Sequence, residues 1–210
     1  MDFQGEFETH ITLDCAPDKL ELLVRWSEKR ELKFVHIVLS RGETGSQPML
    51  TRHSTGTLQS ELRRAQELSR ECESAGFPVA RVKLEVAPHN SAVPRQIANV
   101  DSEQSYFEHH IKLLLPPDAD LDALQLETEK HGVHLSRNAR RFRDDGQQER
   151  FVTGRCYGVG RLEAKSAFDA LLQTLRAFPF PVLETEEEFV VYDSNLALDA
   201  GWLEPAAPSP

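Results

Sequence analysis

A chain of 210 residues is long enough for one large domain or for two domains of about 100 residues. Hydrophobic residues make up 40% of it and charged residues 28%, and the mean hydropathy is -0.45, which excludes a disordered or membrane-spanning protein. The formal net charge of -10 disfavours general nucleic-acid binding, because a polyanion would be repelled.

The hydrophobic pattern of the first half changes regularly between strand-like alternation and helix-like spacing. A strand is expected at 6–13, followed by a helix from Asp18 to about Glu31. A hairpin comes next, then a second helix that ends at Gly76, and a final strand closes the half. The hairpin strands cover 33–39 and 48–54, the second helix begins near Leu58, and the last strand covers 79–86.

The second half repeats this order of elements, and it repeats short sequences too. FETHITL at 7–13 returns as FEHHIKL at 107–113, and further pairs of residues match in the same order along both halves. Matching positions of the two halves are about 100 residues apart, with small drifts that are typical of insertions in loops. The expected strands and helices of this half are 106–115, 119–131, 133–138, 149–157, 161–177 and 182–192.

The element order β-α-β-β-α-β is that of a ferredoxin-like unit. The sequence therefore predicts an α+β fold made by tandem duplication of this unit. A first lobe is expected at 1–87 and a second at 105–203, joined by a polar, proline-containing linker at 88–104. The tail at 204–210 has no periodicity and is expected to be disordered.

The repeated strands carry polar residues on the face that alternation turns away from the helices. In a ferredoxin-like sheet the first and third strands are neighbours, so polar residues of the third strand should lie beside them. If the two open faces turn toward each other, they enclose a cleft between the lobes, a usual place for a ligand site. The residues expected to line it are Glu8, His10, Thr12, Thr51 and His53 in the first lobe, and Glu108, His110, Lys112, Thr153 and Arg155 in the second.

The tripeptide His10-Ile11-Thr12 resembles the H-x-T signature of the 2H phosphoesterases, a bilobal α/β family with one such motif on each lobe. The resemblance implies that His10 and His110 are catalytic and act as general acid and base on a cyclic or 2′-5′ phosphodiester. It also implies that Thr12 holds the phosphate. The second motif departs from the family pattern, since Lys112 stands where the hydroxyl residue belongs, although a lysine can hold a phosphate as a point charge.

Two other functions fit the same residues. Glu8 and Glu108, together with the histidines two residues later, are adequate ligands for zinc or manganese, so a divalent metal site is one alternative. No other cofactor is expected. The open sheet faces could instead pack against each other or against a partner, which would make the chain a non-catalytic binding or assembly protein.

Charge indicates which ligand the cleft should prefer. Lys112, Arg155 and the arginine-rich stretch RNARRFR at 137–143 outnumber the two glutamates, so the sequence predicts a small anion such as phosphate or a nucleotide monophosphate. The stretch ETEEEF at 184–189 is expected to be a solvated edge strand whose charges discourage pairing with another strand.

Nothing in the sequence predicts attachment to a membrane. No apolar run approaches the roughly 18 residues that a membrane span requires. The start MDFQGEFETH also lacks the basic-then-apolar pattern of a secretory signal. A cytoplasmic location is the default expectation, and the sequence leaves the oligomeric state open.

Overall fold

The computed structural model describes residues 2–96 and 105–203. The first half contains β1 (Gln4–Leu13), α1 (Leu20–Glu28), β2 (Lys33–Leu39), β3 (Ser46–Thr57), α2 (Leu58–Ser74) and β4 (Val79–Val86). The second half contains β5 (Tyr106–Leu115), α3 (Leu121–Glu129), β6 (His134–Asn138), β7 (Gln148–Tyr157), α4 (Arg161–Leu175) and β8 (Val182–Asp193). The predicted tail at 204–210, and residues 97–104 of the predicted linker, lie outside the described residues.

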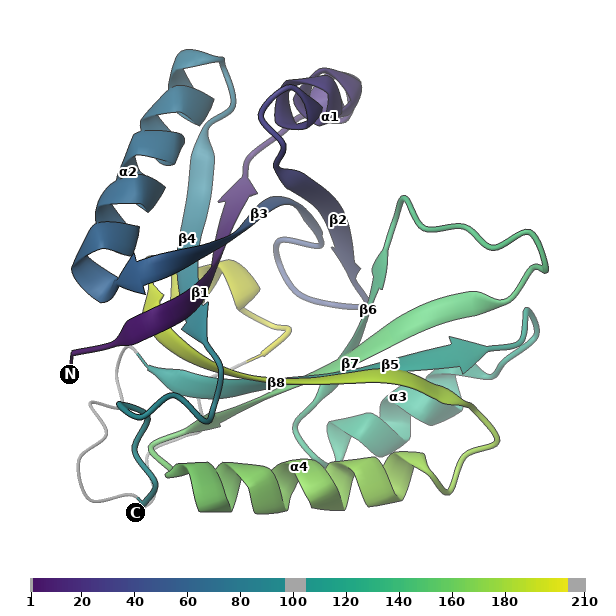
Figure 1. Cartoon of the computed structure of the whole chain (residues 1–210). Coiled ribbons are helices and arrows are strands. Elements are labelled where there is room, and N and C mark those ends of the chain that lie inside the picture. The colour runs from purple at the N-terminus through teal and green to yellow at the C-terminus, as the bar shows by residue number, and fades with distance from the viewer. Residues whose placement is uncertain (1, 97–104, 204–210) are drawn as a thin grey trace.

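The strands form one closed antiparallel barrel of eight strands in the order β1-β3-β2-β6-β7-β5-β8-β4 (Figure 1). The predicted fold class, a tandem pair of separate ferredoxin-like units with open sheet faces, is therefore wrong. The two halves join at both edges of their sheets, because β2 pairs with β6 and β4 pairs with β8. An edge strand leaves a row of backbone donors and acceptors unpaired, and closure of the barrel pairs part of that row, at 37–39 of β2 and 83–86 of β4.

The helices pack against the outer face of the barrel, so the chain is an α+β protein with its cores outside the lumen. α2 begins with a capping box, in which Thr57 and Ser60 each bond through the side chain to the other's backbone N–H. The first core contains Ile11 and Leu13 of β1, Leu23 of α1 and Leu68 of α2, and the second contains Ile111 and Leu113 of β5, Leu124 of α3 and Phe168 of α4. Because strand side chains alternate, the residues between these apolar positions on β1 and β5 point into the barrel.

The segment after β8 folds back onto the barrel through a short 3-10 helix, Leu196–Asp199. Gly201 has a φ of 73°, a left-handed conformation that glycine adopts without strain. Trp202 then packs against Leu39, and its indole Nε1–H donates to the carbonyl of Leu135 at 3.2 Å. This anchoring brings Asp199 into the barrel interior, where its carboxylate is fully buried.

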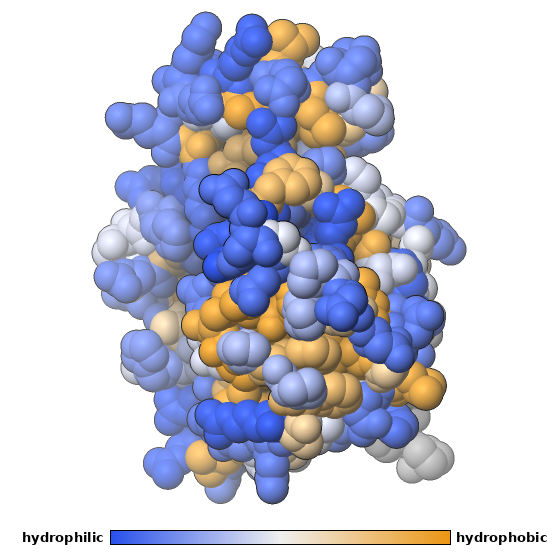
Figure 2. Space-filling model, turned by 90° about the vertical axis from the view of Figure 1, so that its right-hand side faces the viewer, coloured by the Kyte–Doolittle hydropathy of each residue, from blue (hydrophilic) through white to orange (hydrophobic). Residues whose placement is uncertain are grey.

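The outer surface is mostly hydrophilic on the face shown in Figure 2. An apolar area gathers in the lower half of that view, at the height of α3 and the strands of the second half. Large apolar side chains of this half that are exposed include Leu126 and Phe142. Within the described parts of the chain, no helix has the length and apolar character needed to cross a membrane.

Candidate functional site

The inner faces of the strands enclose a cavity of about 380 Å³, referred to below as the lumen. The predicted cleft between two lobes is thus the inside of one barrel. Nine of the ten predicted cleft residues line it: Glu8, His10, Thr12, Thr51, Glu108, His110, Lys112, Thr153 and Arg155. The tenth, His53, instead borders an adjoining cavity of about 530 Å³, which shares Glu8, Glu186 and Glu188 with the lumen.

His10 is fixed through both ring nitrogens. Its Nδ1 lies 2.9 Å from Oγ1 of Thr51, which is opposite His10 in the β1–β3 ladder. Its Nε2 lies 2.7 Å from Oε2 of Glu85 on β4 and 3.6 Å from Oε1 of Glu8, two residues earlier in β1. Nε2 therefore faces carboxylates, an environment that suits either a proton or a metal ion on this nitrogen.

His110 has the same arrangement in β5. Its Nδ1 lies 2.9 Å from Oγ1 of Thr153, and its Nε2 lies 3.2 Å from Oε1 of Glu108 and 3.6 Å from Oε2 of Glu188. Burial alone would lower the pKa of His110, but the hydrogen bonds to the two carboxylates outweigh it and raise the pKa to about 10. The imidazole is therefore a cation at neutral pH.

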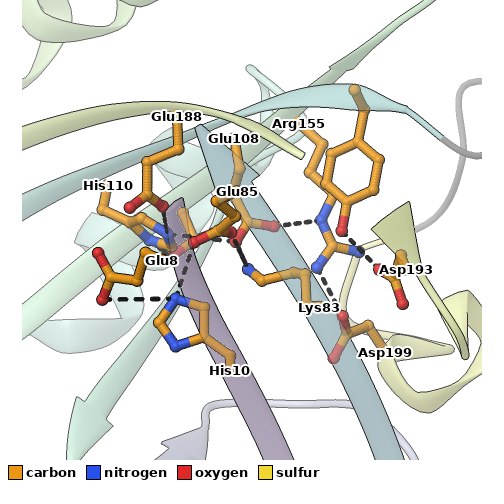
Figure 3. Close-up of polar contacts among 12 residues, drawn as sticks. Glu8, His10, Lys83, Glu85, Glu108, His110, Arg155, Glu188, Asp193 and Asp199 are labelled. Carbon is orange, nitrogen blue, oxygen red and sulfur yellow. Dashed lines mark hydrogen bonds and ion pairs between the residues drawn. The ribbon is translucent and has the colours of Figure 1, made fainter. Parts of the chain in front are cut away.

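Lys83 of β4 joins the two Glu-His strands (Figure 3). Its Nζ lies 2.6 Å from Oε1 of Glu85 and 2.5 Å from Oε1 of Glu108, and Arg155 approaches the other oxygen of Glu108 at 2.5 Å. Burial would raise the pKa of Glu85, but Lys83 holds it below its usual value. The pKa of Glu108, which burial would also raise, is held well below its usual value by Arg155 and Lys83.

Arg81 and Arg155 share the carboxylate of Asp199, each at 2.6 Å, and Arg81 also binds both carboxylate oxygens of Asp193. All four side chains are at most 5% exposed. The buried and half-buried charges around the two histidines are unequal in number. Six carboxylates, those of Glu8, Glu85, Glu108, Glu188, Asp193 and Asp199, meet three permanent cations, those of Arg81, Lys83 and Arg155.

The excess of cations on which the sequence-based anion prediction rested is not found around His10 and His110. Lys112 is paired with Glu184, and Arg155 is paired with Glu108 and Asp199. Of the four arginines in the stretch 137–143, Arg141 alone lines the lumen within the described residues. Arg140 binds Glu21 at 2.5 Å, and Arg143 binds Asp145 at 2.9 Å, both outside it.

Glu8 and Glu188 differ from the other carboxylates of the cluster. In the described chain, neither has a lysine or arginine nitrogen within 4.0 Å; Glu8 contacts His10 and His53, each at 3.6 Å, and Glu188 contacts His110. Burial, followed by the negative charge of Glu85, raises the pKa of Glu188 to about 7. Near neutral pH this carboxyl is therefore about half protonated, and another cation can replace its proton.

Two sets of residues bring ligand atoms close enough to hold a metal ion. One set is Glu8, His10 and Glu188, and the other is Glu108, His110 and Glu188. Within each set the ligand atoms lie within 4.8 Å of one another. Glu188 belongs to both sets, so the two Glu-x-His strands meet at a carboxylate supplied by β8.

Sequence reasoning missed Lys83, Glu85 and Glu188. The alternation in VKLEV did carry a signal, because it places Lys83 and Glu85 on one face of β4. The expectation of a solvated edge strand at 184–189 is confirmed in part: residues 184–186 are exposed, and β8 pairs with β4 only from Phe189 onward. Its alternate glutamates, Glu184, Glu186 and Glu188, line the lumen.

No family model and no curated protein matches the chain. Among solved structures, the acetolactate synthase small subunit from Thermotoga maritima is similar, with 12% identity, a TM-score of 0.32 and coverage of 88% of this chain and 94% of that one. A mutant chlorite dismutase from Candidatus Nitrospira defluvii has 11% identity, a TM-score of 0.30 and coverage of 89% and 91%. The imidazole complex of chlorite dismutase from that organism has 13% identity, with the same TM-score and coverage. Likeness at this level carries no argument about function.

Proposed function

We propose that the protein holds a divalent metal ion in the lumen through Glu8, His10 and Glu188 and uses it to act on a small ligand. The supporting observation is that the ligand atoms of these three residues lie within 4.8 Å of one another in a cluster where carboxylates outnumber permanent cations. Buried carboxylates repel one another, and a divalent cation removes this cost. Two carboxylates and one imidazole suit manganese or zinc.

The set around His10 suits a metal better than the set around His110. Both oxygens of Glu108 are already bound by cations, Lys83 on one side and Arg155 on the other. A metal there would have to compete with two buried ion pairs and with the tightly held proton of His110. Among the described residues Glu8 contacts two imidazoles at 3.6 Å and no lysine or arginine, so its carboxylate is free to coordinate. A metal on Nε2 of His10 would have to displace one contact, that with Glu85 at 2.7 Å.

Three protein ligands leave coordination positions for water and substrate, which is the arrangement of catalytic rather than structural metal sites. The reaction class that fits is hydrolysis: a metal held by these residues would supply a water of lowered pKa as nucleophile, and His110 would donate its Nε2 proton to the leaving group and regain one from that water. A metal on Glu188 would also weaken that carboxylate's hold on the proton of His110, and so bring its pKa closer to the working range of an acid.

Calorimetric titration of EDTA-treated protein with manganese and zinc tests the proposal. We expect one ion per chain, bound about tenfold more tightly at pH 8 than at pH 6, because the metal must displace the proton of Glu188, whose pKa is about 7. Glu8→Gln should weaken binding at least about tenfold. The matched control is Glu6→Gln, which changes an exposed glutamate two residues earlier in β1. Equal binding by both variants, or no binding by the wild type, would contradict the proposal.

A second candidate is metal-independent acid–base cleavage of a phosphodiester, the reaction that the resemblance to the 2H phosphoesterases implies. One observation favours it: each histidine is held at Nδ1 by a threonine hydroxyl at 2.9 Å and presents Nε2 to the lumen. Against it, Lys112 in the second motif is already paired with Glu184. The pairing with Glu184 leaves less of the charge of Lys112 available for a phosphate.

Hydrolysis of 2′,3′-cyclic nucleotides in the presence of EDTA separates the two candidates. Metal-independent turnover that is lost in both His10→Ala and His110→Ala would favour the acid–base reaction and would contradict a requirement for metal. Turnover that appears only after manganese or zinc is added, and that Glu8→Gln also removes, would favour the metal centre.

A further inference from the structure

One wall of the lumen is apolar, although the Glu-His cluster lies on the other side. Val35 of β2 is opposite Met49 of β3, Ile37 lies two residues further along β2, and Phe151 of β7 is opposite Lys112 of β5. Val35, Ile37, Met49 and Phe151 all line the lumen and are only partly buried. They belong to neither helix-facing core, so they offer apolar area to a guest in the cavity.

Three cations stand beside this apolar wall and line the same cavity: Lys33 of β2, Lys112 of β5 and Arg141 of the β6–β7 loop. Lys112, and to a smaller extent Lys33 and Arg141, lower the pKa of Glu184, although Arg141 is itself paired with Glu149 at 2.8 Å. Lys112 and Glu184 are directly paired. Lys33 is exposed at the start of β2 and, among the described residues, has no carboxylate within 4.0 Å, so its charge is available to a ligand.

We infer that the lumen binds a small amphipathic organic anion, with its apolar body against Val35, Ile37, Met49 and Phe151 and its anionic group at Lys33. The apolar wall supplies affinity, because contact with it removes water from both surfaces. The lysine supplies selectivity for a negative end over a neutral one. A cavity of about 380 Å³ is near the lower limit for sites that take whole small molecules, which excludes a macromolecular guest.

The position of this site relative to the histidines decides what it could do. Lys112 lies two residues beyond His110 on the same face of β5, and Lys33 is opposite Thr51, the partner of His10. A guest whose charged end is at Lys33 therefore extends along the wall within the cavity that holds both histidines. The inference concerns recognition alone and does not depend on a metal ion.

Titration calorimetry with octanoate tests it, with octan-1-ol as the neutral probe of the same chain length. In EDTA at pH 7.5 we expect saturable binding of octanoate that is about tenfold tighter than that of octan-1-ol. Lys33→Glu should weaken octanoate binding about tenfold and leave octan-1-ol unchanged. Val35→Asn should weaken both probes, because it puts a polar group into the apolar wall.

The matched control is Lys29→Glu, which makes the same charge change at an exposed lysine at the end of α1. It corrects for the general effect of net charge on anion binding. Octanoate binding that is equal in Lys33→Glu and Lys29→Glu would overturn the inference, as would equal affinity for octanoate and octan-1-ol or no binding of either. Because EDTA removes metal ions, the octanoate titration does not depend on whether the protein binds manganese or zinc.

Discussion

The Glu8-x-His10 strand and the Glu108-x-His110 strand share a sequence pattern and two of their cross-strand partners. In both, the histidine is opposite a threonine, Thr51 or Thr153, that holds its Nδ1. The glutamates are also matched, since Glu8 is opposite Glu85 and Glu108 is opposite Glu188. The threonine on the third strand of each half therefore orients both imidazoles alike, and these shared partners leave the charge around each imidazole undecided.

Two positions break the likeness. On the third strand of each half, Glu8 is opposite His53 whereas Glu108 is opposite Arg155. On the fourth, His10 is opposite Lys83 whereas His110 is opposite Glu186. Arg155 binds Glu108 tightly, while His53 is 68% exposed and only 3.6 Å from Glu8. The cross-strand neighbours thus make one glutamate a buried ion-pair partner and leave the other available to a ligand.

The largest expected effect comes from removing the cation that Glu108 has and Glu8 lacks. Arg155→Met leaves Glu108 and Asp199 with one partner fewer in a buried site, and a buried carboxylate without its partner is costly. We expect a loss of about 3–5 kcal/mol in the free energy of unfolding, measured by urea denaturation.

His53→Met is the matched control for this change, because it alters the equivalent ladder position in the other half. The exposed imidazole should be replaceable within about 0.5 kcal/mol. If the two substitutions cost the same, the two strands do not differ in the way their ion pairs indicate.

A smaller effect is expected in the pH dependence that His110 contributes. Its folded-state pKa of about 10 is above the unfolded value of 6.5, so its stabilisation is complete below pH 6.5 and is lost as pH rises toward 10. His110→Gln should therefore destabilise by roughly 2 kcal/mol at pH 6, and the difference from wild type should shrink by pH 10. Urea denaturation at pH 6, 8 and 10 measures it.

The control is His53→Gln, which makes the same substitution at an imidazole that is 68% exposed. A difference between His110→Gln and wild type that is constant from pH 6 to pH 10 would contradict the assignment of a protonated His110 between Glu108 and Glu188.

Local signals in the sequence predicted the helices and strands. The architecture was not predicted, because it depends on pairing between strands that are far apart in the sequence. Alternation placed Ile11 and Ile111 toward the helices and the Glu-His pairs away from them, as the structure has them. The β2–β6 contact that closes one side of the barrel joins residues such as Ile37 and Asn138. No periodicity within either segment encodes which partner an edge strand will find.

The candidate site was predictable to the same extent. Residues on the first and third strands of each half were identified because they recur, whereas Lys83, Glu85 and Glu188 lie on the fourth strand, where Glu85 and Glu188 are equivalent but Lys83 has Glu186 in its place. A run of glutamates such as ETEEEF indicates a solvated surface, and that its alternate members face a lumen follows only from the closure of the barrel. The charge balance of the lumen depends on that closure, so the sequence predicted an excess of cations that the folded chain does not have around the histidines.

The smallest expected effect on stability distinguishes the orientation of each histidine ring from the charge around it. Thr51→Val and Thr153→Val each remove the hydroxyl that holds a histidine Nδ1 and keep the shape of the side chain. Each should cost about 1 kcal/mol in urea denaturation, because one buried hydrogen bond is lost in both halves alike. Manganese or zinc affinity should respond to only one of them: Thr51→Val should weaken it by about 10–100-fold, since a ligating imidazole depends on the partner of its other nitrogen. Thr153→Val should leave it unchanged, because the second histidine carries a proton rather than a metal. An equal loss of metal affinity in both variants would mean that the two strands share the ion, and the asymmetry inferred from Arg155 and Lys83 would then have no functional consequence.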